Sequence, residues 1–252
     1  MNPIKLSVVI ITFNEEKNIR RCLQSLEGVA DEIIVIDSHS TDNTEQICKE
    51  YQVRFYKKKW KGYSIAKNYG NSNAKYEYIL SVDADEVLSD ELRISLLTCK
   101  RNVEYDAYEL NRLTNYCGKW IRHCGWYPEY RIRFWARDTA KWQGILHESL
   151  KFNKKIKLGK LEGDLLHYSF NSISDHLDKV DLFSEVAADE AVNAGFKVNL
   201  FYHIILNPLF TFVNKYIFKL GFLDGFYGVV ICVISSFSNF LKYSKIRMRS
   251  MN

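Results

Sequence analysis

The chain has 252 residues, of which 47% are hydrophobic and 26% charged, and its formal net charge is +5. These proportions are those of a globular protein that buries a sizeable core, and they exclude a chain too polar to fold. The positive charge is concentrated late in the sequence, because seven Lys and Arg stand against one acid, Asp224, from Lys197 onward. This bias favours contact with a polyanionic surface, for which a membrane and a nucleic acid are the usual candidates.

The six cysteines include no Cys-x-x-Cys pair, and three of them fall on predicted helices, where buried free thiols are expected. Cys117, His123 and Cys124 could hold zinc, but their spacing matches no common structural site. The sequence begins with a predicted strand rather than with a charged segment and an apolar core. We therefore expect no signal peptide and a reduced, cytosolic environment.

The first predicted strand, Leu6–Thr12, is a continuous apolar run of the kind found in buried parallel strands. A helical pattern follows it. Asn14 is placed to cap that helix, with acids in the first turn. Alternatively, Thr12, Asn14 and Glu15 lie at the end of the strand and face a ligand.

The second predicted strand, Glu32–Asp37, ends in an acid. At this position Asp37 could contact the base or ribose of a nucleotide, as acids often do in α/β folds. A third strand, Val53–Tyr56, leads through a basic loop to a short helix. That helix is expected to turn Lys67 and Asn68 toward the same edge of the sheet.

The fourth predicted strand, Tyr78–Val82, runs into Asp83-Ala84-Asp85-Glu86, which holds three carboxylates and no Lys or Arg. Carboxylates this close repel one another, and oxygen ligands with a substrate phosphate suit Mg²⁺ or Mn²⁺. We therefore predict a metal on Asp83 and Asp85, with an acidic strand-to-helix turn as the alternative. The alternation of strands and helices predicts an α/β fold with a doubly wound, mostly parallel sheet flanked by helices.

No glycine-rich nucleotide loop follows the first strand, so side chains and metal would have to hold a nucleotide. Four segments in order, at residues 7–15, 37–42, 66–68 and 83–85, resemble glycosyltransferase family 2. The resemblance implies a GT-A fold, an inverting mechanism and a nucleotide-diphosphate sugar donor. The residues that it assigns to the nucleotide sugar are Thr12, Asn14, Glu15, Asp37, Lys67, Asn68 and Asp83.

The middle of the chain, from Tyr116 to Glu148, is rich in aromatic residues and arginine. This block is similar to the branch of the family that includes bacterial lipopolysaccharide-core β-1,4-glucosyltransferases. Trp126 is predicted to stack on a sugar of the acceptor, with ordinary core packing as the alternative. Arg131 and Arg133 are predicted to bind phosphate together, because residues two apart share one face of a strand.

An inverting transfer needs a carboxylate that takes the proton from the acceptor hydroxyl. Glu148 is our candidate for this base, and Asp85 is the second predicted catalytic residue. The alternatives near the same block are Glu129 and Asp138. His147 could orient the base and contact the acceptor, and His167 could complete the metal shell beside Asp85.

The sequence predicts a catalytic domain at residues 1–196, with a nucleotide-sugar half at 1–100 and an acceptor half at 101–196. An apolar and basic helical tail, 197–252, follows it. The run Phe226–Leu241 is shorter than the about 20 apolar residues that span a bilayer, and it contains serines and an asparagine. We expect helices in the interface of an anionic membrane, with Lys and Arg toward the headgroups. Packing of these helices as extra core is the alternative.

Together these expectations describe an inverting hexosyltransferase, bound peripherally at the cytoplasmic face of the inner membrane. It would move a hexose, glucose by the resemblance, from a UDP-sugar to a lipid-linked saccharide during lipopolysaccharide or other envelope glycan synthesis. Mg²⁺ or Mn²⁺ would be the cofactor, and no nucleic acid would be a partner. The rivals are a transferase that uses a polyprenyl phosphate acceptor and a noncatalytic nucleotide-sugar-binding membrane protein.

Overall fold

The computed structural model describes residues 3–144 and 148–251. The chain forms two compact units, the first made of residues 1–112 and 129–167 and the second of residues 113–128 and 168–252. It therefore passes between the units at three places, two of which fall inside strands. This division differs from the predicted boundary at residue 196, because the helix that precedes this residue belongs to the same unit as the tail.

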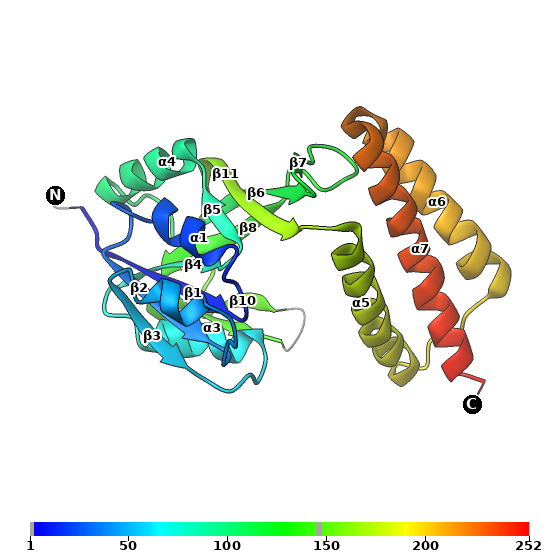
Figure 1. Ribbon diagram of the computed structural model, residues 1–252, viewed down its shortest axis with the longest axis horizontal. Coiled ribbons are helices and arrows are strands. Elements are labelled where there is room, and N and C mark those ends of the chain that lie inside the picture. The colour runs from blue at the N-terminus through cyan, green and yellow to red at the C-terminus, as the bar shows by residue number, and fades with distance from the viewer. Residues whose placement is uncertain (1–2, 145–147, 252) are drawn as a thin grey trace. The chain divides into compact units, whose positions relative to one another are not determined.

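The first unit begins with four parallel strands in the order β3-β2-β1-β4 (Figure 1). These strands are β1 (Leu6–Thr12), β2 (Glu32–Asp37), β3 (Val53–Lys57) and β4 (Tyr78–Asp83). The helices that connect them are α1 (Ile19–Ser25), α2 (Thr44–Cys48) and α3 (Tyr63–Ser72). The pairing of each strand with its neighbour follows the apolar runs that the sequence shows.

Beyond β4 the sheet continues in antiparallel pairings. Its further strands are β5 (Glu86–Leu88), β6 (Ala107–Tyr116), β7 (Lys119–Trp120), β8 (Tyr130–Ala136) and β11 (Leu158–Phe170). The other elements of this part are α4 (Asp90–Arg101), a 3-10 turn (Arg137–Thr139) and a hairpin of β9 (Ala140–Gln143) and β10 (Ser149–Phe152). The predicted α/β class is confirmed, with a mixed sheet that is parallel in its N-terminal half and flanked by helices.

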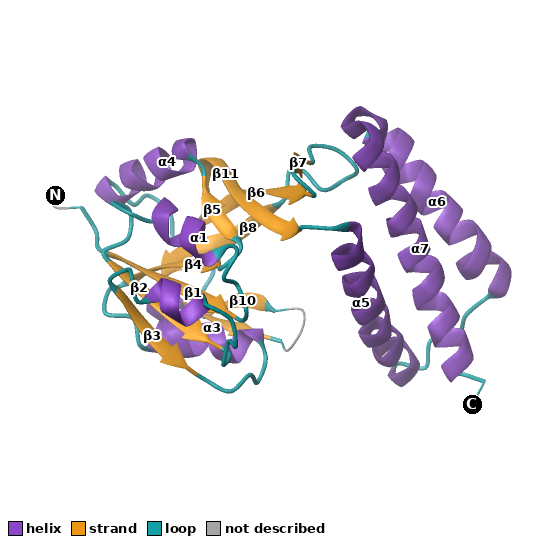
Figure 2. Ribbon diagram, in the orientation of Figure 1, coloured by secondary structure: helices purple, strands orange, loops and turns teal. Residues whose placement is uncertain are grey.

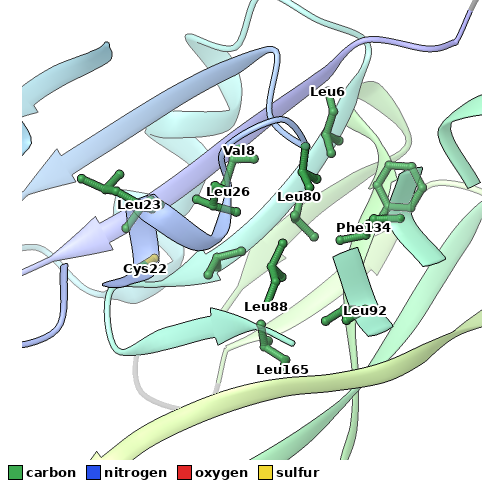
Figure 3. Close-up of a cluster of buried hydrophobic side chains, with 14 of the residues drawn as sticks. Leu6, Val8, Cys22, Leu23, Leu26, Leu80, Leu88, Leu92, Phe134 and Leu165 are labelled. Atoms are coloured by element: carbon green, nitrogen blue, oxygen red, sulfur yellow. The ribbon is translucent and has the colours of Figure 1, made fainter. Parts of the chain in front are cut away.

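Side chains alternate along the parallel strands and therefore build a core on each face of the sheet. Val8 packs with Leu23 of α1 on one face, where α2 and α4 also contribute apolar residues (Figure 3). Val9 belongs to the other face, which α3 and the β9–β10 hairpin cover. There α3 lies so close to the sheet that a Cβ on Gly70 would stand 2.3 Å from Cγ1 of Val9. Helices on both faces leave the ends of the strands as the place for a ligand.

The second unit consists mainly of helices (Figure 2). They are α5 (Ile173–Asn193), a π-helical segment (Leu200–Leu206), α6 (Asn207–Val213), a second π-helical segment (Asn214–Phe218), a 3-10 turn (Gly221–Asp224) and α7 (Gly225–Arg249). A capping box of Ser172 and Asp175 starts α5. α7 packs against both α5 and α6. By length and composition, the segment Gly221–Arg249 could cross a membrane.

Trp126, which was predicted to meet a sugar, lies in an aromatic cluster of the second unit. Its ring stacks on Phe170 with the centroids 5.6 Å apart. Tyr116 is fully buried beside them, and its hydroxyl is hydrogen-bonded to Nδ1 of His176 at 3.0 Å. This arrangement favours the packing alternative for Trp126.

The end of α7 pairs with acids of α5. Lys245 Nζ lies 2.6 Å from Asp181 Oδ1 and 2.7 Å from Glu185 Oε1. Arg249 pairs with Glu185 and with Asp189. The prediction that the basic run points toward lipid headgroups is therefore wrong for Lys245 and Arg249, whose charges hold the two helices together.

Candidate active site

The carboxyl ends of the parallel strands gather several predicted nucleotide residues at one edge of the first unit. Thr12 pairs in register with Asp37, and Ile11 pairs with Asp83 on the other side of β1. The Thr12 hydroxyl is buried and has no hydrogen-bond partner among the described residues. Asp37 accepts hydrogen bonds from the backbone N–H and the hydroxyl of Ser40, and so shapes the loop after β2.

Asn14 joins the loops that follow β1 and β2. Its backbone is left-handed, with φ 53°, a conformation that asparagine adopts more readily than most residues. Its N–H donates to Ser40 Oγ at 2.8 Å, and its Oδ1 accepts the N–H of Thr41 at 2.8 Å. The helix α1 begins after Asn18, so the prediction that Asn14 caps it is wrong. Glu15 accepts a hydrogen bond from Asn18 Nδ2 at 2.6 Å and stiffens the same loop.

A cavity of about 310 Å³ adjoins the end of β2. The residues that line it include Ser38, Lys58, Trp60, Lys61 and Tyr69. Aromatic rings and lysines suit the base and the phosphates of a nucleotide. None of these residues was predicted from the sequence to belong to the site. The signal that could have found them is a run of lysines around a tryptophan, directly after a strand that ends at this edge.

The acidic turn after β4 is neutralised by cations from other elements. Glu86 is fully buried, and one of its oxygens accepts the backbone N–H of Asp83 at 2.9 Å. Arg133 of β8 donates to Asp83 Oδ2 at 2.8 Å and to Glu86 Oε1 at 2.7 Å. Lys67 of α3 places its Nζ 3.2 Å from Asp83 Oδ1. Although the turn itself contains no Lys or Arg, two of its acids are therefore paired with cations from β8 and α3.

Burial and ion pairing shift the pKa values of these carboxyls in opposite directions. Burial would raise the pKa of Asp83, but Arg133 and Lys67 outweigh it and hold that pKa well below its usual range. Burial raises the pKa of Glu86, and the charge of Asp83 adds to this effect while Arg133 opposes it. Asp83 is therefore ionised, and its negative charge is paired with the positive charges of Arg133 and Lys67.

Arg131 and Arg133 do not share one environment, although they are two residues apart on β8. Tyr108 of β6 pairs with Phe134, and the next residue of β6 pairs with Ile132, which leaves Arg133 as an extra residue in a bulge. A bulge interrupts the alternation of side chains along a strand. The Arg131 side chain is 58% exposed and pairs with a neighbouring glutamate, whereas that of Arg133 is 5% exposed. The prediction that the two act together is wrong.

Asp85 and His167 form the pair of side chains that best fits a metal. Asp85 Oδ2 lies 3.2 Å from His167 Nε2, because β11 pairs in register with β5. The His167 Nδ1 atom is buried and has no hydrogen-bond partner among the described residues. A carboxylate and an imidazole are ligands for Mn²⁺, and Mg²⁺ usually takes few protein ligands with substrate phosphates. No described group of three or more His, Cys, Asp or Glu could hold an ion alone.

Glu148 lies next to Lys67, although the two are far apart in the sequence. Lys67 Nζ is 2.9 Å from Glu148 Oε1, and the same nitrogen is the one that pairs with Asp83. The Lys67 side chain is 2% exposed, while that of Glu148 is 21% exposed and can be reached from solvent. The structure thus brings the predicted base to the acidic turn through a shared lysine.

Asn68 fixes the hairpin that leads to Glu148. Its Nδ2 donates to the carbonyl oxygen of Trp142 at 2.8 Å, and its Oδ1 accepts the N–H of Trp142 at 3.0 Å. Lys67 lies over the Trp142 ring, 4.7 Å from the centroid. Lys67 and Asn68 of α3 therefore both position the candidate base. Both polar atoms of the Asn68 side chain are engaged in hydrogen bonds to the hairpin.

The two alternative bases are held by arginines. Glu129 is bound by Arg112 at 2.7 Å and by Arg131, and these arginines overcome the effect of burial and lower its pKa. Asp138 is 80% exposed and pairs with Arg137. Arg112 also lies 3.9 Å from Glu86, but the described ion pairs of Lys67 include Glu148 and neither of these two carboxylates. The predicted contact of His147 lies outside the described residues.

Residues 7–155 of this chain match the model of the glycosyl transferase family 2. An uncharacterized glycosyltransferase of Rickettsia typhi is 31% identical over 98% of this chain and 88% of its own length. The chain therefore belongs to glycosyltransferase family 2 and is an enzyme of that class.

A more distant relative is the lipopolysaccharide core biosynthesis glycosyltransferase LpsC of Rhizobium meliloti. It is 28% identical to this chain over 98% of this chain and 93% of the relative. Among solved structures, residues 1–349 of S. aureus TarS are 16% identical, with a TM-score of 0.46 over 98% of this chain and 91% of that one. The assignment to the family rests on the sequence matches.

Proposed function

We propose that this enzyme is an inverting glycosyltransferase that moves a hexose from a UDP-sugar to a lipid-linked saccharide. The observation that carries the proposal is the contact of Glu148 with Lys67, beside Asp83. It brings a solvent-accessible carboxylate to the edge where a nucleotide sugar would bind. The relationship to LpsC supports lipopolysaccharide or other envelope glycan synthesis as the setting, and the branch resemblance supports glucose as the sugar. We assign donor binding to residues 1–100 and acceptor binding to residues 101–196.

In this reaction the acceptor oxygen forms a bond to the anomeric carbon as the bond from that carbon to the diphosphate breaks. Glu148 takes the proton of the acceptor hydroxyl, and UDP leaves. Asp85 and His167 would hold Mg²⁺ or Mn²⁺, which neutralises charge on the departing diphosphate. Lys67 keeps Glu148 beside the donor, and Thr12 and the cavity after β2 offer contacts to the nucleoside.

The test is Glu148→Gln, which keeps the size of the side chain and removes its basicity. We expect the transfer rate to fall by roughly 10²–10⁴, the range of general acid–base catalysis, with donor affinity nearly unchanged. Glu129→Gln is the matched control, since Glu129 is bound by Arg112 and Arg131 rather than by Lys67, and it should cost little activity.

A Glu148→Gln enzyme within a few-fold of the wild type would contradict the proposal in one of two ways. If the preferred acceptor proves to be a polyprenyl phosphate, the attacking phosphate oxygen needs no base, and that rival is correct. Tight binding of UDP without turnover of any nucleotide sugar would instead favour a noncatalytic binding protein.

We further propose that the enzyme acts at the cytoplasmic face of the inner membrane, bound peripherally. A lipid-linked acceptor presents its sugar at a membrane surface. The uncharged helical segments of the second unit support such a location, because α7 is apolar over most of its length. A cell fractionation in which the protein stays in the soluble fraction, while transferring sugar to the lipid-linked acceptor, would contradict it.

A further inference from the structure

The helix α7 exposes an apolar stripe along one side. Its members follow one another at steps of three or four residues, which places them on one face of a helix. They are Phe226, Val229, Val233, Phe237 and Phe240, with exposed fractions from 38% to 70%. Large exposed apolar patches on a folded protein mark sites of interaction.

A second exposed apolar surface belongs to the segment before α7. Its exposed members include Leu200, Phe201, Ile205, Leu209, Phe210 and Phe218. Residues 198–214 and 225–241 contain no Lys, Arg, Asp or Glu. Both uncharged helical segments therefore carry apolar side chains on their exposed sides, where packing within the protein does not require them.

Two of the polar residues of α7 that argued against a transmembrane span are hydrogen-bonded between the helices. Ser236 Oγ donates to the carbonyl oxygen of Pro208 at 2.7 Å. Asn239 Nδ2 donates to Thr211 Oγ1 at 2.7 Å. Both polar groups therefore have hydrogen-bond partners within the protein and need none from solvent. The exposed side of α6 and α7 remains apolar.

The charges at the ends of these segments have one sign. Asp224 is the only acid after Glu190, and it is buried and paired with His123 at 3.1 Å. Lys215 is half-buried and donates to the carbonyl oxygen of Cys124. From Lys197 onward, the other exposed or half-exposed cations for which the described residues give no ion pair are Lys197, Lys219, Lys242 and Arg247. An apolar surface with a positive rim complements a lipid bilayer with some anionic headgroups, and it offers nothing to a basic protein surface.

We propose that α6 and α7 lie in the interface of a lipid bilayer, with the apolar stripe among the acyl chains and the four free cations at the headgroups. This proposal extends the proposed function, because it names the surface at which the enzyme meets a lipid-linked acceptor. It rests on the proposed function only in assuming that the acceptor is linked to a lipid. The uncharged part of α7, residues 225–241, is about 26 Å long at about 1.5 Å per residue. This uncharged part is shorter than a hydrocarbon core of about 30 Å, so a span by the longer segment Gly221–Arg249 would draw a charged residue toward the core.

The ion pairs between α7 and α5 determine how much electrostatic attraction contributes to membrane binding. Of the basic residues that the sequence offered to headgroups, Lys245 and Arg249 are bound to acids of α5. Apolar insertion therefore dominates, and anionic lipid adds only the attraction of the remaining cations. Since apolar burial is not screened by salt, we expect binding to persist at high ionic strength.

The test is flotation of the full-length protein with vesicles of phosphatidylcholine, alone or mixed with phosphatidylglycerol. The double variant Phe226→Gln/Phe237→Gln should weaken binding to both vesicles by roughly tenfold or more. Ile94→Gln, at an exposed apolar position of α4 in the first unit, is the matched control and should bind like the wild type. Lys242→Gln/Arg247→Gln should lose only the gain given by phosphatidylglycerol.

A second measurement does not depend on the double variant folding. Phe237→Trp should show extra fluorescence quenching by phosphatidylcholine brominated on its acyl chains, and Ile94→Trp should not. Binding only to anionic vesicles with full release in salt would overturn the proposal, as would an absence of quenching. Failure to bind any vesicle, with a dimer in solution that Phe237→Gln breaks, would assign the stripe to a second copy of the chain.

Transfer to a short, water-soluble saccharide acceptor separates this proposal from the function. If the stripe variant keeps that activity and loses the vesicles, both proposals stand. If the wild type transfers no sugar to any acceptor but still inserts into vesicles, the proposed function fails and the membrane surface stands.

Discussion

Replacing Arg133 by methionine should destabilise the first unit more than any exposed ion pair could. The Arg133 side chain is 5% exposed and carries the charge that Asp83 and Glu86 share. Methionine fills much of the space but leaves the fully buried Glu86 and the half-buried Asp83 without this partner. Removal of one member of a buried pair costs about 3–5 kcal/mol, a large part of the about 5–15 kcal/mol that stabilises a typical domain.

The neighbouring Arg131 provides the control on the same strand. Its side chain is 58% exposed, and its pair with Glu129 contributes about 0–1 kcal/mol, as exposed pairs do. Arg131→Met should therefore change the free energy of unfolding by less than about 1 kcal/mol. Adding Glu86→Gln to Arg133→Met should restore part of the loss, because one buried acid no longer needs a cation.

The assay is urea unfolding followed by far-ultraviolet circular dichroism, with hydrogen exchange of the β4 peptide as a local measure. Arg133→Met should shift the urea midpoint strongly and expose β4 amides to exchange. The reasoning is refuted if Arg133→Met and Arg131→Met are equally mild. It is also refuted if Glu86→Gln makes the Arg133 variant worse, since the acid would then be stabilised by groups other than this arginine.

Three further outcomes are expected. Asp85→Asn should weaken UDP binding roughly tenfold or more, and the remaining binding should no longer depend on Mg²⁺ or Mn²⁺. The measurement is calorimetry of UDP binding. If the wild type binds UDP equally well with and without a chelator, the metal proposal is contradicted. Gly70→Ala should destabilise the first unit by about 1–3 kcal/mol, because its Cβ would clash with Val9; a wild-type melting temperature would contradict this. Burial, with the charges of Lys179 and Lys215, lowers the pKa of His176 to about 4. The unfolded chain thus binds this proton first, and stability should fall as pH drops from about 6.5 to about 4, by at most about 1.4 kcal/mol per pH unit; His176→Gln should reduce this slope in urea titrations.

The sequence predicts those parts of the fold that depend on local patterns. Apolar runs locate the parallel strands, and the acid at the end of β2 and the acidic turn after β4 do fall at one edge of the sheet. The helix α5 begins where its Ser172 capping signal stands. These features need only periodicity and chain order, so one sequence is enough to find them.

The sequence does not predict which charges meet across the fold. The bulge that separates Arg133 from Arg131 depends on the pairing of β8 with β6, and no local signal marks it. Likewise, Lys245 looks like a residue for headgroups until α5 is packed against α7 and supplies Asp181. Glu148 was predicted to be the base, but its partner Lys67 lies on α3, 81 residues earlier in the chain. In each case the missing information is strand register or helix packing.

The charge balance of the acidic turn decides where a divalent ion adds most. Three carboxylates belong to the turn itself, those of Asp83, Asp85 and Glu86, and the carboxylate of Glu148 lies beside it. In the part of the chain that the structure describes, the two cations that lie within 3.2 Å of these acids are Lys67 and Arg133, and they contact three of the four. Among the described residues, the remaining acid is paired with an imidazole, His167, which is itself a metal ligand when neutral. Two positive charges offset only two of the four negative charges, and Asp85 is the acid that neither cation contacts. An added diphosphate would increase the excess negative charge beside it. A divalent ion is best accommodated there, while Asp83 keeps its lysine and arginine.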